Sequence, residues 1–216
     1  MNTIASYSVP SPRLRGEGGA QSATGEGLRR SRTKIAIAAL LLATGLTLVG
    51  QAGYIHAKAI LAQILLDRAF SETISTGRST KPWSWADTWP VARVEVLRLH
   101  ESSIVLAGSS GQALAFGPGQ LENTPEAGER GTAVYSAHRD THFRFLGRVQ
   151  VGDEIRVTRR DGVRVTFRVT RTAVARWDEA EIDPQASGRN LVLVTCWPLD
   201  GKTQGPLRYL VFAEAS

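Results

Sequence analysis

The longest apolar stretch of the chain runs from Ile35 to about Ile55 and is nearly free of charge. A stretch of this length crosses a bilayer core of ~30 Å as one helix. Basic residues come immediately before it, namely Arg29, Arg30, Arg32 and Lys34. Positive residues favour the cytoplasmic side of a membrane segment. The pattern therefore predicts a single-pass anchor, with the N-terminus in the cytoplasm and the remaining chain outside.

Residues 1–33 are rich in Gly, Ser, Arg and Glu and show no periodicity, which is typical of a disordered cytoplasmic tail. A cleaved signal peptide is the alternative to an anchor. The apolar run is longer than the apolar part of a signal peptide, and no convincing small-x-small cleavage site follows a short one. We therefore expect an uncleaved anchor over residues 34–56 in the inner (cytoplasmic) membrane, with the following domain facing the periplasm or the exterior.

Residues 57–91 connect the anchor to the remaining chain. Their apolar positions recur near a helical period and are Ile60, Leu61, Ile64, Leu65 and Ile74. The spacing predicts a stalk helix that Gly77 ends, and a regulatory or dimerising helix is the alternative. The Trp-rich segment 81–90 follows, and its indoles are expected to clamp the linker onto the fold. Contact with the bilayer interface or with a peptide substrate is the alternative for these indoles.

Short apolar runs separated by turn residues occupy 92–216, which we expect to form one domain. Asp161-Gly162 is a strong hairpin signal, and a helical turn is expected near Leu121. Many short strands with little helix are typical of a mainly β fold, either an antiparallel barrel or a sandwich. The predicted strands cover 94–99, 104–107, 113–116, 132–137, 154–160, 163–174, 191–196 and 207–214.

Composition narrows the function classes. At 216 residues the chain has room for one domain and an anchor. The net charge of +6 is spread along the chain, and no aromatic residues alternate with basic ones in a recognisable binding motif, so nucleic acid is not an expected partner. The single cysteine, Cys196, excludes an intramolecular disulfide. A free thiol outside the cytoplasm risks oxidation, which favours a working thiol over an inert one.

Cys196 ends the apolar run that begins at Leu191, and Pro198 stops the strand just beyond it. A thiol in this position is an inert buried side chain, a metal ligand or a nucleophile. His138 follows another short apolar run, and Arg208 starts the last one. A cysteine nucleophile needs an imidazole for proton transfer and a cation where the oxyanion develops. The three residues therefore predict nucleophilic catalysis.

Several motifs together resemble the sortases, the membrane-anchored cysteine transpeptidases of bacterial surfaces. They are Ala137-His138-Arg139-Asp140-Thr141, Phe145-Leu146, Val151-Gly152-Asp153-Glu154-Ile155, Leu193-Val194-Thr195-Cys196 and Arg208 before a hydrophobic strand. The resemblance covers roughly Ala92 to the C-terminus and implies a closed eight-stranded β-barrel. Residues 83–90 and 106–119 resemble the proteobacterial branch of class GN, or marine, sortases, which implies one dedicated partner protein.

The resemblance implies roles for four residues. Cys196, as a thiolate, is expected to attack a backbone carbonyl and form a thioester. His138 is expected to protonate the departing amine and later to accept a proton from the incoming one. Arg208 is expected to hold the oxyanion or the substrate main chain, because its charge is permanent. Thr195 is expected to shape the substrate or oxyanion pocket. Each residue also has a purely structural alternative. Cys196 would be a core thiol, His138 a structural histidine, Arg208 a solvated arginine and Thr195 an ordinary strand residue.

No metal or cofactor is predicted. His138 and His142 are four residues apart, as zinc ligands on a helix would be, with Cys196 as a third. The segment follows a strand, however, and no fourth ligand stands out, so this alternative is weak. Asp140 is expected to cap a short helical turn over 143–146. A calcium site would draw on an acidic set that we expect to be a solvated loop, namely Glu122, Glu126 and Glu129.

These observations predict a cysteine transpeptidase that cleaves a C-terminal sorting signal of a secreted protein and passes the acyl group to an amine. Its partners would be that secreted protein, the amine acceptor and the membrane that it crosses once. The same site with water as the acceptor gives a cysteine endopeptidase. A non-catalytic barrel that binds envelope proteins is the third hypothesis, and the order His138, Cys196, Arg208 argues against it.

Overall fold

The computed structural model describes residues 23–180, 182–201, 203 and 205–216, with side chains from Lys34 onward. The chain divides into two compact units, Met1–Tyr54 and Ile55–Ser216. Within the described residues, the first unit consists of the first part of helix α1 (Ala23–Thr76), and the second unit holds the rest of α1 and all the strands.

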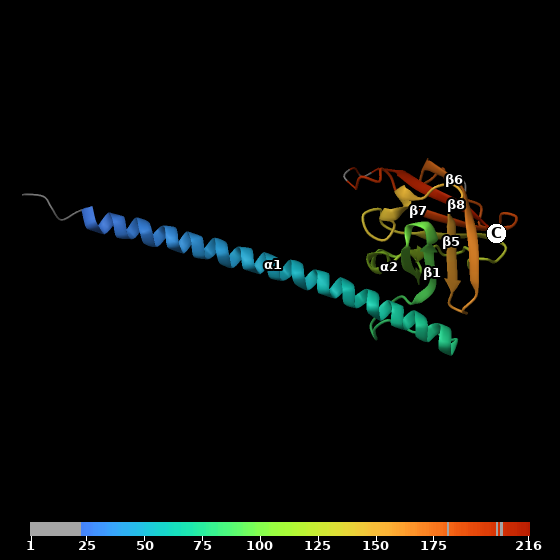
Figure 1. The fold of residues 1–216 in the computed structure, drawn as a ribbon, viewed down its shortest axis with the longest axis horizontal. Coiled ribbons are helices and arrows are strands. Elements are labelled where there is room, and N and C mark those ends of the chain that lie inside the picture. The colour runs from blue at the N-terminus through green and yellow to red at the C-terminus, as the bar shows by residue number, and fades with distance from the viewer. Residues whose placement is uncertain (1–22, 181, 202, 204) are drawn as a thin grey trace, which may run out of the picture. The chain divides into compact units, whose positions relative to one another are not determined.

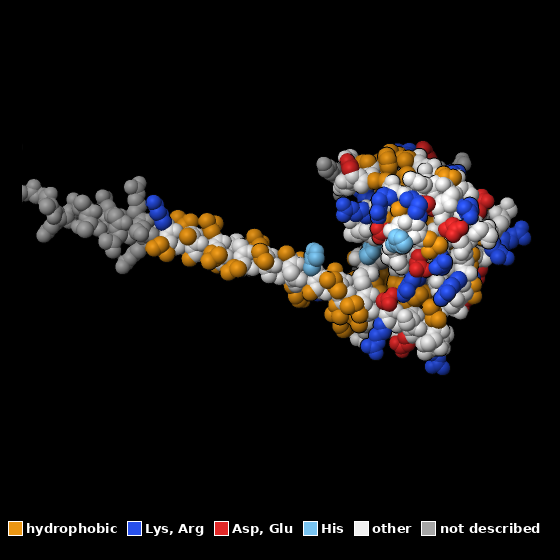
Figure 2. All heavy atoms as spheres, viewed as in Figure 1, with side chains coloured by type: hydrophobic (Ala, Val, Ile, Leu, Met, Phe, Trp, Pro, Cys, Tyr) orange, Lys and Arg blue, Asp and Glu red, His pale blue; other side chains and the backbone are white. Residues whose placement is uncertain are grey.

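In the first unit, helix α1 exposes apolar side chains (Figure 2). Among them are Ile35 and Val49, whose exposed fractions are 65% and 71%. From Lys34 it is the one helix in the described part of the chain that is long and apolar enough to cross a membrane. The helix begins at Ala23, so the predicted disordered tail is wrong for residues 23–33. These residues include good helix formers, and a helix that has nucleated extends cheaply into them. The rest of the predicted tail lies outside the described residues.

In the second unit, α1 packs on the barrel through Leu66 and Phe70, which are buried together with Ile104, Leu106 and Ala113. The helix ends at Thr76, and Gly77 follows with a φ of 68°. This left-handed conformation is common just after a helix and suits glycine best, as the sequence predicted.

Eight strands form a closed barrel in the order β1-β2-β3-β4-β7-β8-β6-β5 (Figure 1). This confirms the predicted mainly β, closed-barrel fold class. The short helices are α2 (Gly111–Phe116), η1 (Leu97–Leu99) and η2 (Arg144–Arg148). The strands are β1 (Pro90–Val96), β2 (Glu101–Ala107), β3 (Gly119–Gln120), β4 (Gly131–Ser136), β5 (Glu154–Arg159), β6 (Arg164–Arg176), β7 (Arg189–Cys196) and β8 (Leu207–Ala215).

The barrel interior is filled by apolar side chains that come from alternate strand positions. Tyr135, Phe143, Phe167, Leu191 and Leu193 have no exposed surface. Because β7 places Leu191 and Leu193 inside, the period of two also sends Thr195 inward and Cys196 outward. The core thereby fixes the direction in which the thiol points.

Two predicted elements differ from the structure. Residues 113–116 belong to helix α2 and not to a strand, because the hydroxyl of Ser110 accepts a hydrogen bond from the N–H of Ala113 and so caps the helix. Near Leu121 the structure has no helix; instead the two-residue strand β3 joins β2 to β4. Both elements are shorter than the window over which an apolar period can be read.

The Trp-rich linker contacts the fold through only some of its rings. Trp83 packs edge-to-face against Phe116, with 5.0 Å between ring centroids. The Trp89 carbonyl accepts a hydrogen bond from the N–H of Ala107 over 2.9 Å. Trp85 is 83% exposed. The clamp interpretation therefore applies to the Trp83 indole, Trp89 is held through its main chain, and Trp85 is free for another contact.

Asp153 joins two loops and should make stability pH-dependent. Its carboxylate accepts hydrogen bonds from Arg98 at 2.6 and 2.8 Å and from the N–H of Gln150 at 2.8 Å. The Arg98 hydrogen bonds hold the pKa of Asp153 below its usual value. Asp153→Asn is expected to lower the free energy of unfolding by about 1–2 kcal/mol at pH 7, with Arg98 partly exposed. The measurement is urea unfolding of the full chain in detergent.

The prediction is tested by measuring how the difference in free energy of unfolding between wild type and Asp153→Asn changes with pH. A lowered native pKa stabilises the fold above the unfolded-state value near 4 and loses its effect as the pH falls through the native value. The wild-type advantage over Asp153→Asn should therefore be constant above pH ~5 and shrink below pH ~4. Asp178→Asn removes the exposed pair with Arg176 and is the control. A pH-independent difference, or an equal loss in the control, would contradict the prediction.

Candidate active site

The predicted catalytic residues lie at one rim of the barrel because β4 and β7 run parallel. Ser136 is paired with Val194, and the N–H of Ala137 donates to the Val194 carbonyl over 3.1 Å. Both strands therefore end at the same rim, which carries His138 on one strand end and Cys196 on the next. β8 runs antiparallel to β7 and begins at this rim.

Arg208 is the direct cross-strand partner of Cys196 in the β7–β8 ladder. Residues paired across a ladder send their side chains to the same face, so the guanidinium and the thiol share the outer face of the barrel. Both residues are half-buried, and His138 is exposed. The structure thus brings the three predicted residues to neighbouring strand ends, although no hydrogen bond joins their side chains within the described residues.

The Arg208 guanidinium is held by the main chain that precedes it. Its Nη1 donates to the carbonyls of Gly205 at 3.2 Å and Leu207 at 2.9 Å. Nε and Nη2 make no hydrogen bond to the described residues. A guanidinium held by one nitrogen keeps a directed set of donors for a developing negative charge.

Thr195 makes a contact that differs from the predicted one. Its side chain is inside the barrel with 2% exposed, and its hydroxyl donates to the Ala137 carbonyl over 2.7 Å. The predicted role of Thr195 in a substrate or oxyanion pocket stays a prediction. The Thr195 hydroxyl ties the residue before His138 to the residue before Cys196.

A second tie, made by Arg139, was not predicted from the sequence. Arg139 is 9% exposed, and its Nη1 donates to the Pro198 carbonyl over 2.7 Å. It connects the residue after His138 to the turn after Cys196, so the two ties bracket both predicted catalytic residues. No sequence signal reveals this contact, because the acceptor is a main-chain carbonyl far along the chain. The buried charge itself is the only hint, and it shows only in the structure.

The loop after His138 is a turn that leads into η2. The N–H of Phe143 donates to the His138 carbonyl over 3.1 Å. Phe143 occupies the cap position of η2 without a side-chain cap, so the predicted capping by Asp140 is wrong. Burial lowers the pKa of His142; a hydrogen bond with the backbone of Ala115 raises it, and the charge of His138 lowers it further.

The residues considered as metal ligands have other contacts. Glu126 pairs with Arg159 at 3.0 Å and with Arg160 at 2.7 Å, and Glu129 also lies within reach of Arg159. In the portion of the chain that is described, no group of three or more His, Cys, Asp or Glu residues could hold a metal ion.

An apolar surface adjoins the thiol on the outer face. Val134, Val192 and Leu210 are buried there, under residues of the segment between β6 and β7 that include Ala180 and Ile182. The surface therefore continues along the strands that end at Cys196 and begin at Arg208. Half-buried Val194 and Phe212 pack against this cluster, and an extended peptide with apolar side chains could lie along them with one carbonyl at the thiol.

Arg139→Leu should separate positioning from stability. Replacing a buried charge by an apolar side chain of similar volume is often neutral for stability, so the urea midpoint should change little. Misplacement of His138 relative to Cys196 should lower turnover by about 10–100-fold. Arg139→Lys, which keeps the charge, should recover part of the loss. The measurement is the rate of substrate processing and its pH profile, with exposed Arg164→Leu as the control. Equal turnover in Arg139→Leu and wild type would contradict the positioning role.

Comparison with known proteins identifies the family. The family model of the sortase domain matches residues 94–216. The chain is similar to sortase D of Bacillus subtilis (strain 168), with 27% identity over 122 residues that cover 56% of this chain and 61% of the relative.

Solved structures show the same barrel. Sortase A from Corynebacterium diphtheriae is 22% identical with a TM-score of 0.55, covering 61% of this chain and 63% of that chain. Sortase E from Streptomyces avermitilis is 28% identical with a TM-score of 0.50, covering 59% of this chain and 88% of that chain. The chain spans less than two thirds of the length of the Bacillus relative and of the Corynebacterium structure. With its closed barrel and its matched domain, the chain belongs to the sortase family.

Proposed function

We propose that this protein is a membrane-anchored cysteine transpeptidase that cleaves the C-terminal sorting signal of a secreted protein and transfers the acyl group to an amine. The observation that carries the proposal is the cross-strand pairing of Cys196 with Arg208 beside the strand end that leads to His138. Family membership supports the reaction class, and the rim geometry supports the residues.

In the proposed first half-reaction, the thiolate of Cys196 attacks the scissile carbonyl carbon, and the carbonyl oxygen gains the negative charge. The Nε and Nη2 donors of Arg208, which make no hydrogen bond to the described residues, stabilise that oxyanion. The C–N bond then breaks as His138 gives a proton to the departing amine, which leaves a thioester on Cys196.

In the second half-reaction, an incoming amine attacks the thioester carbonyl. His138, now neutral, accepts the proton that the amine loses, and the C–S bond breaks to return the thiolate. The product is a new amide. Thr195 and Arg139 act as positioning residues, because their hydrogen bonds hold the main chain on both sides of the rim.

The membrane part of the proposal places residues 34–56 in the inner membrane and residues 1–33 in the cytoplasm. Residues 57–91 then connect the anchor to a catalytic domain of residues 92–216 in the periplasm or outside. The length and composition of α1 support a membrane span, and its basic flank supports the orientation. The motifs in 83–90 and 106–119 support the class GN branch, and with it one dedicated partner protein.

The alternative functions keep the barrel but change its use. With water as the acceptor the same thioester gives a cysteine endopeptidase, and the observations at the rim favour neither outcome. A non-catalytic module that binds envelope proteins would need no thiol on the outer face. The position of Cys196 opposite Arg208 therefore favours an enzyme over a binding module.

The test compares envelope proteins from native cells with and without the gene by mass spectrometry of their C-termini. The proposal predicts at least one protein that keeps its C-terminal tail only when the gene is absent. In wild-type cells the mass of its new C-terminus distinguishes an amine conjugate from a free acid. If no C-terminus changes, although the protein is expressed and folded in the wild type, the binding module replaces the enzyme.

A further inference from the structure

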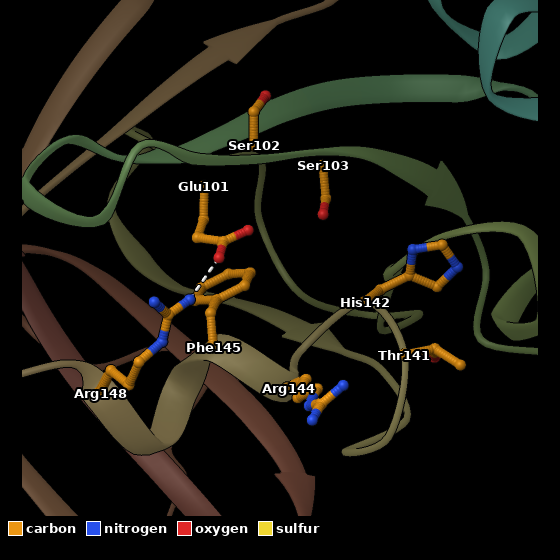
Figure 3. A pocket seen from close by; sticks show the side chains of 8 residues that line it. All are labelled: Glu101, Ser102, Ser103, Thr141, His142, Arg144, Phe145 and Arg148. Carbon is orange, nitrogen blue, oxygen red and sulfur yellow. Dashed lines mark hydrogen bonds and ion pairs between the residues drawn. The ribbon is translucent and has the colours of Figure 1, made fainter. Parts of the chain in front are cut away.

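A polar pocket of about 650 Å³ lies between β2 and the segment that follows His138 (Figure 3). Cys196 does not line it, so the pocket is separate from the thiol and from the apolar surface beside the thiol. Its lining residues are Glu101, Ser102, Ser103, Thr141, His142, Arg144, Phe145 and Arg148. The aromatic ring of Phe145 is its main apolar component.

The pocket holds a cation without an anionic partner. Arg148 forms an ion pair with Glu101 across the pocket (Figure 3), which neutralises both charges. The Arg144 guanidinium makes no ion pair or hydrogen bond with the described residues, and the residue is exposed. Burial keeps His142 predominantly neutral at pH 7, since it lowers the pKa of that ring. The pocket therefore carries a net charge of about +1, provided by the Arg144 guanidinium.

Hydroxyl groups line the same pocket as this cation. The side chains of Ser103 and Thr141 make no hydrogen bond with the residues that the structure describes, and Ser103 points into the pocket (Figure 3). A guanidinium with adjacent hydroxyl groups is suited to a carboxylate or phosphate, because such oxyanions accept charge-assisted hydrogen bonds in a fork. An unpaired Glu101 carboxylate would repel an anionic ligand. Its ion pair with Arg148 offsets that repulsion.

The pocket is linked by the main chain to His138, the proposed proton-transfer group. Thr141 and His142 belong to the turn closed by the Phe143–His138 hydrogen bond, and the charge of His138 reaches His142. The donor polypeptide would occupy the apolar surface of β7 and β8. The polar pocket, which Cys196 does not line, is then left for the second substrate.

We propose that this pocket binds a carboxylate or phosphate group of the acceptor amine, with Arg144 as its main contact. The inference rests on the proposed transpeptidase function, since an acceptor exists only in that reaction. It assigns the acceptor to a chemical class: a primary amine that also carries an oxyanion group. A soluble peptide and a lipid headgroup both satisfy this chemistry.

The first experiment measures binding without catalysis. Full-length Cys196→Ala protein in detergent is titrated calorimetrically with inorganic phosphate and with triglycine or triglycinamide, whose C-terminal amide replaces the carboxylate, at constant ionic strength. Phosphate and triglycine should bind at least about tenfold more tightly than triglycinamide. Adding Arg144→Gln should remove this preference, Arg144→Lys should retain part of it, and exposed Arg164→Gln should leave it unchanged. An unchanged preference in Arg144→Gln overturns the proposal.

The second experiment follows the product in cells. Arg144→Gln should lower the ratio of amine-conjugated to hydrolysed C-termini by about tenfold, because the acceptor binds more weakly while water competes as before. Extraction into organic solvent identifies a lipid acceptor, and retention in the aqueous phase a soluble one. An unchanged ratio overturns the inference. Absence of tail removal in wild-type cells would instead reject the transpeptidase, and the calorimetric result would still decide whether the pocket binds anions.

Discussion

Cells that carry Cys196→Ala are expected to leave the sorting signal uncut, with processing slowed by roughly 10⁴–10⁶-fold. The alanine methyl group has no lone pair with which to attack a carbonyl, so no thioester forms and neither half-reaction proceeds. The residual rate should equal that of spontaneous hydrolysis in the envelope. Pulse labelling of the substrate, followed by intact-mass analysis of its C-terminus, measures the rate.

The control must show that the fold survives the substitution. Cys196 is half-buried on the outer face, so loss of its sulfur should leave the urea midpoint nearly unchanged. Ser136→Ala truncates another half-buried side chain at the same rim and should process substrate at the wild-type rate. Normal processing by Cys196→Ala would show that another residue is the nucleophile.

Phe167→Ala is expected to give the largest loss of stability, about 3–5 kcal/mol in the free energy of unfolding. Phe167 has no exposed surface and lies in the barrel core, on a strand that pairs with both β5 and β8. Truncation removes the ring from the core and leaves a cavity. The hydrogen-bonded strands of the closed barrel cannot easily move inward to fill that cavity. Urea unfolding of the full chain in detergent, followed by tryptophan fluorescence, measures the change.

Val163→Ala provides the comparison for Phe167→Ala. Val163 is 49% exposed next to the β5–β6 turn, and its truncation should change the free energy of unfolding by less than about 0.5 kcal/mol. A loss below ~1.5 kcal/mol for Phe167→Ala would mean that the barrel collapses into the cavity. The core would then be less rigid than its burial indicates.

The strands and the end of β7 at Cys196 could be predicted because their signals are local, whereas closure of the strands into a barrel was implied by the resemblance to the sortases. Leu191 to Val194 form a continuous apolar run, which is typical of a strand buried on both faces, and Pro198 ends the strand whatever the rest of the chain does. Asp161-Gly162 closes the β5–β6 hairpin, where Gly162 has a φ of 82° and the Asp161 carboxylate accepts from the N–H of Val163. Such short-range determinants are present in the sequence itself.

Other features depend on partners that are distant in sequence. Arg139 is buried because a carbonyl of the β7–β8 turn accepts its hydrogen bond, and no pattern near Arg139 indicates that acceptor. The hydrogen bond from the Thr195 hydroxyl to the Ala137 carbonyl depends on the parallel pairing of β4 with β7, which is a property of the topology. Residues 113–116 read as a strand from their apolar content, although the Ser110 cap favours a helix. Strand pairing, long-range hydrogen bonds and helix capping, more than hydrophobicity, determine these three features.

Mass spectrometry of the peptide that contains Cys196 tests the central claim most directly. The full-length protein is isolated from cells under acid quench, which preserves thioesters, and half of the sample is treated with hydroxylamine, which cleaves them. The account predicts a fraction of Cys196 whose mass is increased by an acyl fragment from the substrate, and loss of this increase after hydroxylamine. Processed substrate in cells whose Cys196 carries no acyl group, with the adduct on another residue, would contradict it.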